Sequence, residues 1–448
     1  MPDRNPSNEL VFERVFDAPR ELVFAAWTSP VHLPCWYGPH GFTTAVERMD
    51  VRSGGSAQLV MRGPDGTRYP DELAYEEVVA PERLVIVHRA HRETAEPSPV
   101  EFRQIVTFED RGARTKMTMR LVFASAEARD ANVRTYHSDE GGVQTLERLG
   151  AHVGEMSFFT ETERPTIVMT RLLDAPRGLV FGVITQPEHL ARWWGPRRTQ
   201  LVTCEVDLRP GGRYRYVLRT PDGRDAPFSG EYREVSLARL VFTQKYEPAP
   251  GEAAVITCTL TDVGDKTLLE LVQDARSFAQ RDAILATGAK SGAVESHDRL
   301  AELLGELVVH GRELVLEREF AAPLQRVWDV WTNPEHLARW WGPRGFTTKN
   351  WQLELRAGGR ASYVMVAPDG SEYPFDGTHV EVVPRERLVT RGVIHGGVEV
   401  TTTVAFAARG DKTLVSVRQT FSKETAATRG SRMGWTQQLD RLGKHLAV

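Results

Sequence analysis

One stretch of sequence occurs three times: DAPRELVFAAWTSPVHLPCWYGP at residues 17–39, DAPRGLVFGVITQPEHLARWWGP at 174–196 and AAPLQRVWDVWTNPEHLARWWGP at 321–343. The same landmarks follow each occurrence in the same order: a Gly-Gly pair, a Pro-Asp-Gly turn, and an Arg-Leu pair in a helical pattern. The period is far longer than the roughly 20–50 residues of a solenoid repeat, so each copy is a whole domain. We predict domains at residues 7–155, 163–306 and 311–448, with short linkers near 155–164 and 306–312.

Composition narrows the class of protein. A chain of 448 residues with 41% hydrophobic and 26% charged residues is typical of about three globular domains. A net charge of −4 provides no basic surplus for nucleic acid, and no run approaches the ~20 apolar residues of a membrane span. The first residues lack the apolar segment of a secretion signal, so we expect a cytoplasmic protein. The three cysteines are widely separated, which favours neither a disulfide framework nor a metal site.

The third copy shows the element pattern most clearly. Alternating apolar and charged residues predict a strand at 313–320, and Pro323 begins a helix that carries Trp328 and Trp331. A second short helix covers 334–341 and ends at Gly342-Pro343. Strands are predicted at 346–356, 359–367, 372–383, 386–394, 397–408 and 412–421, and a long helix at 429–446. The connections are too short for crossovers, so the sheet is expected to be antiparallel, with the long helix on one face and a ligand gap between them.

Taken together, these motifs resemble the activator-of-Hsp90-ATPase homologue (AHSA1) family of the START-like, or SRPBCC, helix-grip superfamily. The features that carry the resemblance are the repeated P-E-H-L-A-R-W-W-G-P, the Gly-Gly-Arg strand pair, the Pro-Asp-Gly turn and the closing G-W-x-x-x-L-x-x-L helix. The resemblance implies an α+β fold of three tandem helix-grip domains, each a curved antiparallel sheet wrapped round a long C-terminal helix. It also implies a cavity between the sheet and that helix, but it does not select one activity.

Aromatic residues near the Gly-Pro turn are the main candidates for lining such a cavity. The first aromatic of each turn could instead be a plug that packs the short helix on the sheet, and the second is expected to be partly exposed. The residue after each turn could contact an anionic ligand. The candidate cavity residues are Trp36, Tyr37, His40, Tyr69, Trp193, Trp194, Arg197, Phe228, Trp340, Trp341, Arg344, Phe375 and Trp435.

Other recurring polar residues favour structural roles. The histidines of the Pro-x-His-Leu motif, His32, His189 and His336, are expected on the helix surface, without a carboxylate partner at fixed spacing. Three aligned glutamates, Glu77, Glu234 and Glu381, are expected to point outward and to pair across strands. Cys35 replaces an arginine of the other copies and is expected to be a half-buried, inert thiol. Asp71 and Glu72 align with Phe228 and Ser229 in the second copy and with Phe375 and Asp376 in the third, so chemistry that needs a fixed pair of carboxylates is not expected here.

The last helix differs between the copies. Trp435 of the third copy corresponds to Ala293 and Gly142, and losing an indole removes a side chain that buries roughly 150–250 Å². We therefore predict that the first or second copy has an aromatic-lined cavity of ~300 Å³ or more. Alternatively Tyr136, Phe278 or another ring fills the space.

These observations favour non-catalytic binding of a small apolar or aromatic molecule, with no cofactor and no metal. An enzyme of the cyclase or hydrolase-like kind, with one active copy, is the first alternative. The second is an interaction protein of an Hsp90-type chaperone, although the N-terminal Hsp90-binding domain of the eukaryotic activator has no counterpart in this sequence.

Overall fold

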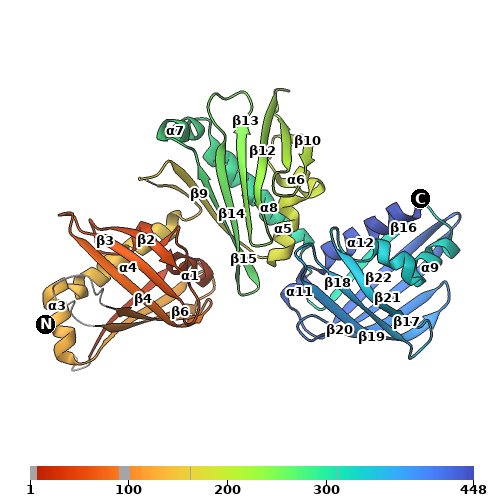
Figure 1. Ribbon diagram of the computed structural model, residues 1–448, viewed down its shortest axis with the longest axis horizontal. Coiled ribbons are helices and arrows are strands. Elements are labelled where there is room, and N and C mark those ends of the chain that lie inside the picture. The colour runs from red at the N-terminus through yellow and green to blue at the C-terminus, as the bar shows by residue number, and fades with distance from the viewer. Residues whose placement is uncertain (1–7, 90–100, 162, 310, 448) are drawn as a thin grey trace. The chain divides into compact units, whose positions relative to one another are not determined.

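A computed structural model describes residues 8–89, 101–161, 163–309 and 311–447 (Figure 1). The chain divides into two compact units. The first contains the described residues up to Leu172 together with 254–264 and 268–290, and the second contains 173–253, 265–267 and the described residues from Ser291 onward. Among the described residues, no helix is both long and apolar enough to cross a membrane.

The described part of the first copy is a seven-stranded antiparallel sheet with four helices. Its strand order is β1-β7-β6-β5-β4-β3-β2, so the first strand lies beside the last and the others form a meander. The long helix α4 packs against β1. The elements are β1 (Glu9–Phe16), α1 (Arg20–Thr28), α2 (Leu33–Trp36), β2 (Thr43–Met49), β3 (Ser56–Arg62), β4 (Arg68–Val79), β5 (Arg83–Arg89), β6 (Phe102–Asp110), β7 (Thr115–Phe123), α3 (Ala126–Tyr136) and α4 (Ser138–Glu155).

The second copy repeats this order with one additional strand. Its sheet runs β10-β11-β12-β13-β14-β15-β9-β8. The elements are β8 (Phe158–Thr160), β9 (Thr166–Leu173), α5 (Arg177–Thr185), α6 (Pro187–Trp193), β10 (Gln200–Val206), β11 (Arg213–Arg219), β12 (Asp225–Val235), β13 (Arg239–Tyr246), β14 (Ala254–Val263), β15 (Lys266–Asp274), α7 (Phe278–Ala286) and α8 (Ala289–Leu307).

The third copy confirms the element pattern predicted from the sequence. Its sheet runs β16-β22-β21-β20-β19-β18-β17, and α12 packs against β16. The elements are β16 (Glu313–Phe320), α9 (Leu324–Thr332), α10 (Pro334–Trp340), β17 (Thr347–Leu353), β18 (Arg360–Val366), β19 (Glu372–Val383), β20 (Arg387–Ile394), β21 (Val398–Arg409), β22 (Lys412–Phe421), α11 (Ala426–Arg429) and α12 (Ser431–Leu446). The predicted α+β class and the antiparallel sheets are therefore correct.

Two sequence expectations need correction. The polar linker expected near 155–164 contains the strand β8, which pairs antiparallel with β9. The prediction also missed a helix before the last one in each copy, namely α3, α7 and α11. Each of these three helices begins after a serine or threonine whose side chain accepts a hydrogen bond from the first turn, a local signal that apolar periodicity does not report. The domain boundaries themselves stay a prediction.

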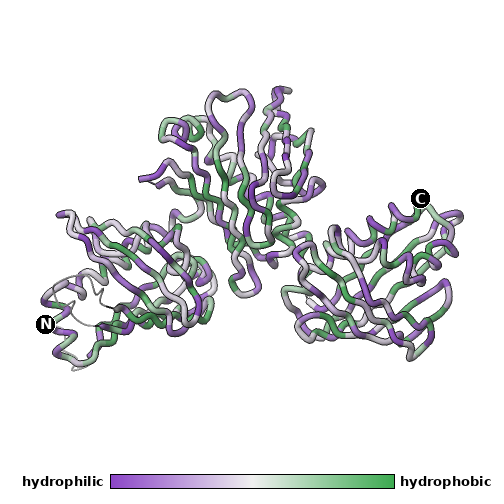
Figure 2. Tube along the Cα trace, viewed as in Figure 1, coloured by the Kyte–Doolittle hydropathy of each residue, from purple (hydrophilic) through white to green (hydrophobic). Residues whose placement is uncertain are grey.

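The core of each copy comes from strand alternation. Hydrophobic and hydrophilic residues alternate along many strands (Figure 2). In β7 every second side chain, from Thr115 to Phe123, is buried. These residues pack with α1 and α4 in one continuous apolar cluster, which also includes Val263 and Leu268 of β14 and β15.

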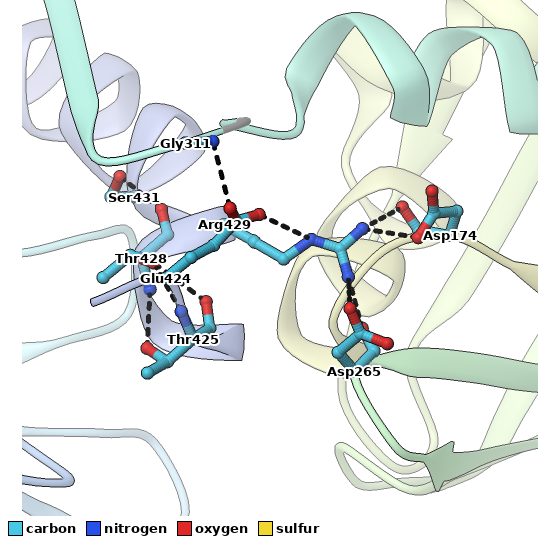
Figure 3. Close-up of polar contacts among 8 residues, drawn as sticks. All are labelled: Asp174, Asp265, Gly311, Glu424, Thr425, Thr428, Arg429 and Ser431. Atoms are coloured by element: carbon cyan, nitrogen blue, oxygen red, sulfur yellow. Dashed lines mark hydrogen bonds and ion pairs between the residues drawn. The ribbon is translucent and has the colours of Figure 1, made fainter.

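Within the second unit, Arg429 connects the third copy to residues of the second (Figure 3). Its side chain is buried, and its guanidinium donates to the carboxylates of Asp174 at 2.6 Å and Asp265 at 2.7 Å. It also donates to the main-chain carbonyls of both aspartates. A buried arginine is tolerated because four acceptors replace its water shell.

Candidate functional site

The repeated turn is fixed by an arginine from the long helix of its own copy. In the first copy Arg148 donates to the carbonyl oxygens of Gly38 at 2.8 Å and Pro39 at 2.9 Å. The second and third copies make the same bonds, from Arg299 to Gly195 and Pro196 and from Arg441 to Gly342 and Pro343. This contact explains why the Arg-Leu pair recurs with the turn, and it is structural.

The first aromatic of each turn is a plug. Trp36 and Trp340 are fully buried and Trp193 nearly so. Each indole Nε1 donates to a main-chain carbonyl ten residues earlier, that of Ala26, Val183 or Val330. The indole N–H is the only hydrogen-bond donor of this side chain, and it is already used within the protein. The tryptophan therefore packs the two short helices together and does not line a cavity.

The second aromatic of each turn faces the interior between the sheet and the last helix. In the third copy Trp341 is half-buried, and its ring centroid lies 6.1 Å from that of Trp331. The centroids of Trp351 and Trp435 both lie 5.7 Å away, and that of Tyr363 lies 5.6 Å away. The ring of Trp341 is therefore enclosed on several sides by other aromatic side chains.

A row of stacked rings crosses the inner face of the sheet in the third copy. Trp351 of β17 stacks on Tyr363 of β18 at 4.5 Å, and Tyr363 stacks on Phe375 of β19 at 5.1 Å. Their interplanar angles are 27° and 25°. Burial raises the pKa of Tyr363 to about 12, so this hydroxyl stays neutral.

The second copy has fewer rings at the same places. Trp194 contacts Tyr216 at 4.9 Å and Phe228 at 5.3 Å, the counterparts of Tyr363 and Phe375. Three indoles of the third copy are replaced: Trp331 by Ile184, Trp351 by Cys204 and Trp435 by Ala293. Each replacement removes a ring that buries roughly 150–250 Å². Trp194 and Phe228 are half-buried.

In the first copy the position of Trp435 is filled by a ring from β1. A Cβ atom on Gly142 would lie 2.6 Å from Cε1 and 2.9 Å from Cε2 of Phe12, so the phenyl ring occupies this space. The expectation that another ring repacks the site is correct for this copy. Tyr136, the ring named for this copy, is 43% exposed, and Phe278, the ring named for the second copy, is 45% exposed.

The first copy replaces the ring row with a polar cluster. At the positions of Tyr363 and Phe375 it has Leu59 and Asp71. Asp71 accepts a hydrogen bond from Nδ1 of His88 at 3.0 Å, and Nε2 of His88 donates to Oε1 of Gln104 at 2.9 Å. The side chains of His88 and Asp71 are only 9% and 14% exposed.

The electrostatics of this cluster favour a charged pair. Burial lowers the pKa of His88, but the charge of Asp71 and the hydrogen bonds that His88 donates to Asp71 and Gln104 raise it by more, so the net pKa lies above its ordinary value. Because both ring nitrogens face acceptors, the imidazolium with its two N–H donors fits both contacts. Burial, and then the Asp71 charge, raise the pKa of Tyr37 and of Tyr75, so both hydroxyls are neutral.

Sequence reasoning discounted Asp71 because its counterparts are phenylalanines. The signal that could have found it is strand alternation, since Asp71 shares a face of β4 with the buried Leu73 and Tyr75. His88 and Gln104 are on two other strands, and only the register of β4, β5 and β6 brings the three side chains together.

The expected surface position of the Pro-x-His-Leu histidine is wrong for the first copy. His32 is fully buried, and its Nδ1 lies 3.0 Å from Nε2 of His152. On its other side, Nε2 of His32 lies 3.0 Å from Oγ1 of Thr170 and 3.3 Å from Oε1 of Glu270. His32 therefore has a carboxylate partner, Glu270 of β15, which is too far along the chain for a sequence motif to reveal it. In the third copy, by contrast, the pair of His336 and its neighbour on α12 is only partly buried.

Burial and the neighbouring His32 lower the pKa of His152 to about 3. His152 is therefore neutral and can accept a hydrogen bond from Nδ1 of His32. Ser29 completes the cluster, because its hydroxyl donates to Glu270 at 2.6 Å. All these side chains are enclosed, which makes the cluster a packing feature of the first unit.

The remaining sequence candidates lie at the surface. His40 and Arg197 are exposed and pair with Glu147 and Glu302 of the long helices, and Arg344 is exposed and contacts Asp440. Tyr69 is half-buried, and its ring lies 5.7 Å from that of Phe42. The aligned glutamates Glu77, Glu234 and Glu381 pair outward with Arg83, Arg239 and Arg387, as expected.

Cys35 is half-buried, as expected, and burial raises the pKa of its thiol to about 11. At neutral pH this cysteine is a thiol, which is a weak nucleophile. Among the described residues, no group of three or more His, Cys, Asp and Glu side chains could hold a metal ion.

Two surface hollows differ from the predicted aromatic cavity. One, of about 560 Å³, lies in the third copy, and the other, of about 480 Å³, lies in the second. Half of the residues that line each hollow are charged: Glu354, Arg360, Asp376 and Arg391 in the third copy, and Glu205, Arg213, Arg215 and Glu231 in the second. An aromatic cavity of the predicted size stays a prediction.

The family comparison agrees with the repeat. The model of the family described as "Activator of Hsp90 ATPase homolog 1-like protein" matches residues 17–154, 174–305 and 321–447. No curated protein matches the chain. A solved structure from Chromobacterium violaceum is 26% identical and covers 31% of this chain and 98% of its own, with a TM-score of 0.29.

Two further solved structures are similar to single copies. One from Arthrobacter aurescens is 26% identical, with 34% of this chain and 90% of that chain covered and a TM-score of 0.32. The AHSA1 protein from Silicibacter pomeroyi is 24% identical, with 30% and 97% covered and a TM-score of 0.28. With three family matches that together span most of its length, the chain belongs to the activator-of-Hsp90-ATPase homologue 1-like (AHSA1) family.

Proposed function

We propose that the second copy binds a small aromatic or apolar molecule against the rings of Trp194, Tyr216 and Phe228. The observation that carries the proposal is the replacement of an indole by Ala293 on the helix that faces this turn. In the third copy the corresponding Trp435 is buried and lies 5.7 Å from Trp341, the counterpart of Trp194. A ligand ring in the second copy would make the contacts that Trp435 makes in the third.

The chemistry of the surrounding side chains favours an apolar guest. Trp194 presents its ring edge-to-face to both Tyr216 and Phe228, with interplanar angles of 61° and 80°, an arrangement that adds attraction beyond the area buried. Burial raises the pKa of Tyr216 well above its ordinary value, so its hydroxyl carries no charge. Cys204 is half-buried and its thiol pKa is raised to about 11, mainly by burial. An anion would therefore meet no cation from these four side chains.

The test fills the space with the side chain that the third copy uses. The full chain is titrated with 2-methoxynaphthalene, and binding is followed by calorimetry and by the shift in melting temperature. Ala293→Trp is expected to weaken binding at least ~10-fold, since the new indole excludes the probe. Ala301→Trp is the matched control, because Ala301 is exposed on the same helix. The proposal fails if the wild type does not bind the probe, or if Ala293→Trp binds it as well as Ala301→Trp.

A further inference from the structure

The first copy contains a second, chemically different candidate site, which does not depend on the binding proposed for the second copy. It consists of Asp71 on β4, His88 on β5 and Gln104 on β6, and the buried Tyr75 shares the face of β4 with Asp71. The three polar side chains lie on the inner face of the sheet, and Asp71 stands where the third copy has Phe375, the last ring of its stacked row. Nothing in the scaffold role of this sheet requires an ionisable pair, because the other two copies have phenylalanine at the position of Asp71.

The network fixes which atoms are left for a ligand. Gln104 directs its Nε2 at Sδ of Met119, 3.0 Å away, so its Oε1 faces His88. His88 then uses both of its N–H donors, one on Gln104 and one on Asp71. A carboxylate accepts about four hydrogen bonds, and His88 takes up only part of this capacity. The group that remains to bind a ligand is therefore an acceptor, the carboxylate of Asp71.

The surroundings define the rest of the ligand. The His88–Asp71 pair has no net charge when both groups are ionised, and burying a charged ligand beside it would cost solvation free energy that the pair cannot offset. Phe102 stacks on the imidazole with ring centroids 4.3 Å apart, and Tyr75, on the same face of β4 as Asp71, is buried, so this face of the sheet carries aromatic side chains. Leu59 and Asp71 are smaller than Tyr363 and Phe375, which they replace.

Another polar group in this interior supports a ligand. Nε1 of Trp27 is buried and has no hydrogen-bond partner among the described residues. Its ring lies 6.5 Å from that of Tyr37, and both rings belong to the apolar cluster of the first copy. A buried donor without a partner is destabilising, and an acceptor atom on a bound molecule would relieve this cost.

We propose that the first copy binds a small, neutral, hydroxylated aromatic molecule whose hydroxyl group donates a hydrogen bond to Asp71. The ring of the molecule lies among the aromatic side chains of Tyr37, Tyr75 and Phe102, and the oxygen of the same hydroxyl is the acceptor available to the interior donors. The first and second copies then select different ligands, one by a hydrogen bond and the other by ring contacts alone.

The experiment compares two probes that differ in a single donor. The full chain with Ala293→Trp, in which the site of the second copy is filled, is titrated with 2-naphthol and with 2-methoxynaphthalene. A hydrogen bond to a charged group predicts roughly 10- to 100-fold tighter binding of 2-naphthol. Adding Asp71→Asn is expected to remove most of this preference. Adding Glu76→Gln is the control, since Glu76 is exposed on the same strand.

Equal affinity for the two probes, no binding of 2-naphthol, or an undiminished preference after Asp71→Asn would each overturn the proposal. If Asp71→Asn prevents folding, the comparison of the two probes in the Ala293→Trp chain still decides it. The two proposals fail in different ways. If the proposal for the second copy is wrong, Ala293→Trp leaves the binding of 2-methoxynaphthalene unchanged. If the proposal for the first copy is wrong, the chain shows no preference for 2-naphthol over 2-methoxynaphthalene.

Discussion

The packing of Phe12 against Gly142 predicts an unusual response to a common stabilising substitution. Gly142 is in the interior of helix α4, where replacing glycine with alanine normally stabilises a helix by about 0.5–1 kcal/mol. Here the new Cβ would lie 2.6 Å from Cε1 and 2.9 Å from Cε2 of Phe12, whereas carbon atoms pack best at about 3.5–4.0 Å. Overpacking of this kind costs about 1–3 kcal/mol. We therefore expect Gly142→Ala to lower the free energy of unfolding of the first copy by about 1 kcal/mol.

The same helix supplies the control. A Cβ atom on Gly154 would have no heavy atom within 4 Å, so Gly154→Ala is expected to be neutral or stabilising. In the background of Phe12→Ala the clash is absent, and Gly142→Ala should then stabilise the chain, which gives a coupling free energy of at least about 1 kcal/mol between the two positions.

The assay is hydrogen exchange of the backbone amides of β6 and β7 in the full chain, which reports the unfolding free energy of the first copy separately from the others. Circular dichroism confirms that each variant is folded. If Gly142→Ala stabilises the wild type as much as it stabilises the Phe12→Ala chain, then Phe12 does not occupy the space that Trp435 fills in the third copy, and the account of why this position is closed is wrong.

Three further substitutions test other parts of the structure. Trp435→Ala removes a buried ring and should lower the unfolding free energy of the third copy by about 3–5 kcal/mol by hydrogen exchange, while Lys444→Ala, exposed on the same helix, should change it by less than about 0.5 kcal/mol. His152 has a folded pKa of about 3, below its value of about 6.5 in the unfolded chain, so the unfolded state binds the extra proton and stability falls as the pH drops below about 6.5. The free energy of unfolding should be about 2 kcal/mol lower at pH 5 than at neutral pH. If the His152→Leu chain keeps the whole dependence of stability on pH, His152 is not the group responsible. Asp174→Asn weakens one of the two carboxylate contacts of the buried Arg429 and should lower the free energy of unfolding in urea by about 1 kcal/mol. The expected loss is modest because Asp174 is 66% exposed. If the unfolding free energy is unchanged at both high and low salt, this ion pair does not stabilise the chain.

The element pattern could be predicted because its signals are local. Alternation with a period of two, proline at the start of a helix and glycine-proline at its end placed the strands and helices of the third copy within a few residues. The short helices α3, α7 and α11 were missed, since their signal is a capping side chain and not an apolar stripe.

The candidate sites needed more than local signals. Some of the rings, Trp194, Phe228, Trp341, Phe375 and Trp435, were named from the sequence, because the repeat aligns them. Tyr216, Tyr363 and Trp351 were not named, and ring contacts in the structure reveal them. The sequence also showed that Ala293 replaces a tryptophan. It did not show that a ring from β1 closes the corresponding place in the first copy, because the contact of Phe12 with Gly142 joins residues 130 positions apart in the chain.

By itself, the sequence determined that the chain is three copies of one helix-grip domain and that the copies differ around a shared turn. Only the tertiary structure decided which of the differing side chains contact one another. Asp71, His88 and Gln104 come from three strands, and their hydrogen bonds exist because strand register places them on one face as diagonal neighbours. In the same way, only the tertiary structure brings His32 into contact with its carboxylate partner, Glu270. The physical reason is that periodicity fixes which face a side chain occupies, whereas pairing between distant strands fixes which side chains share that face.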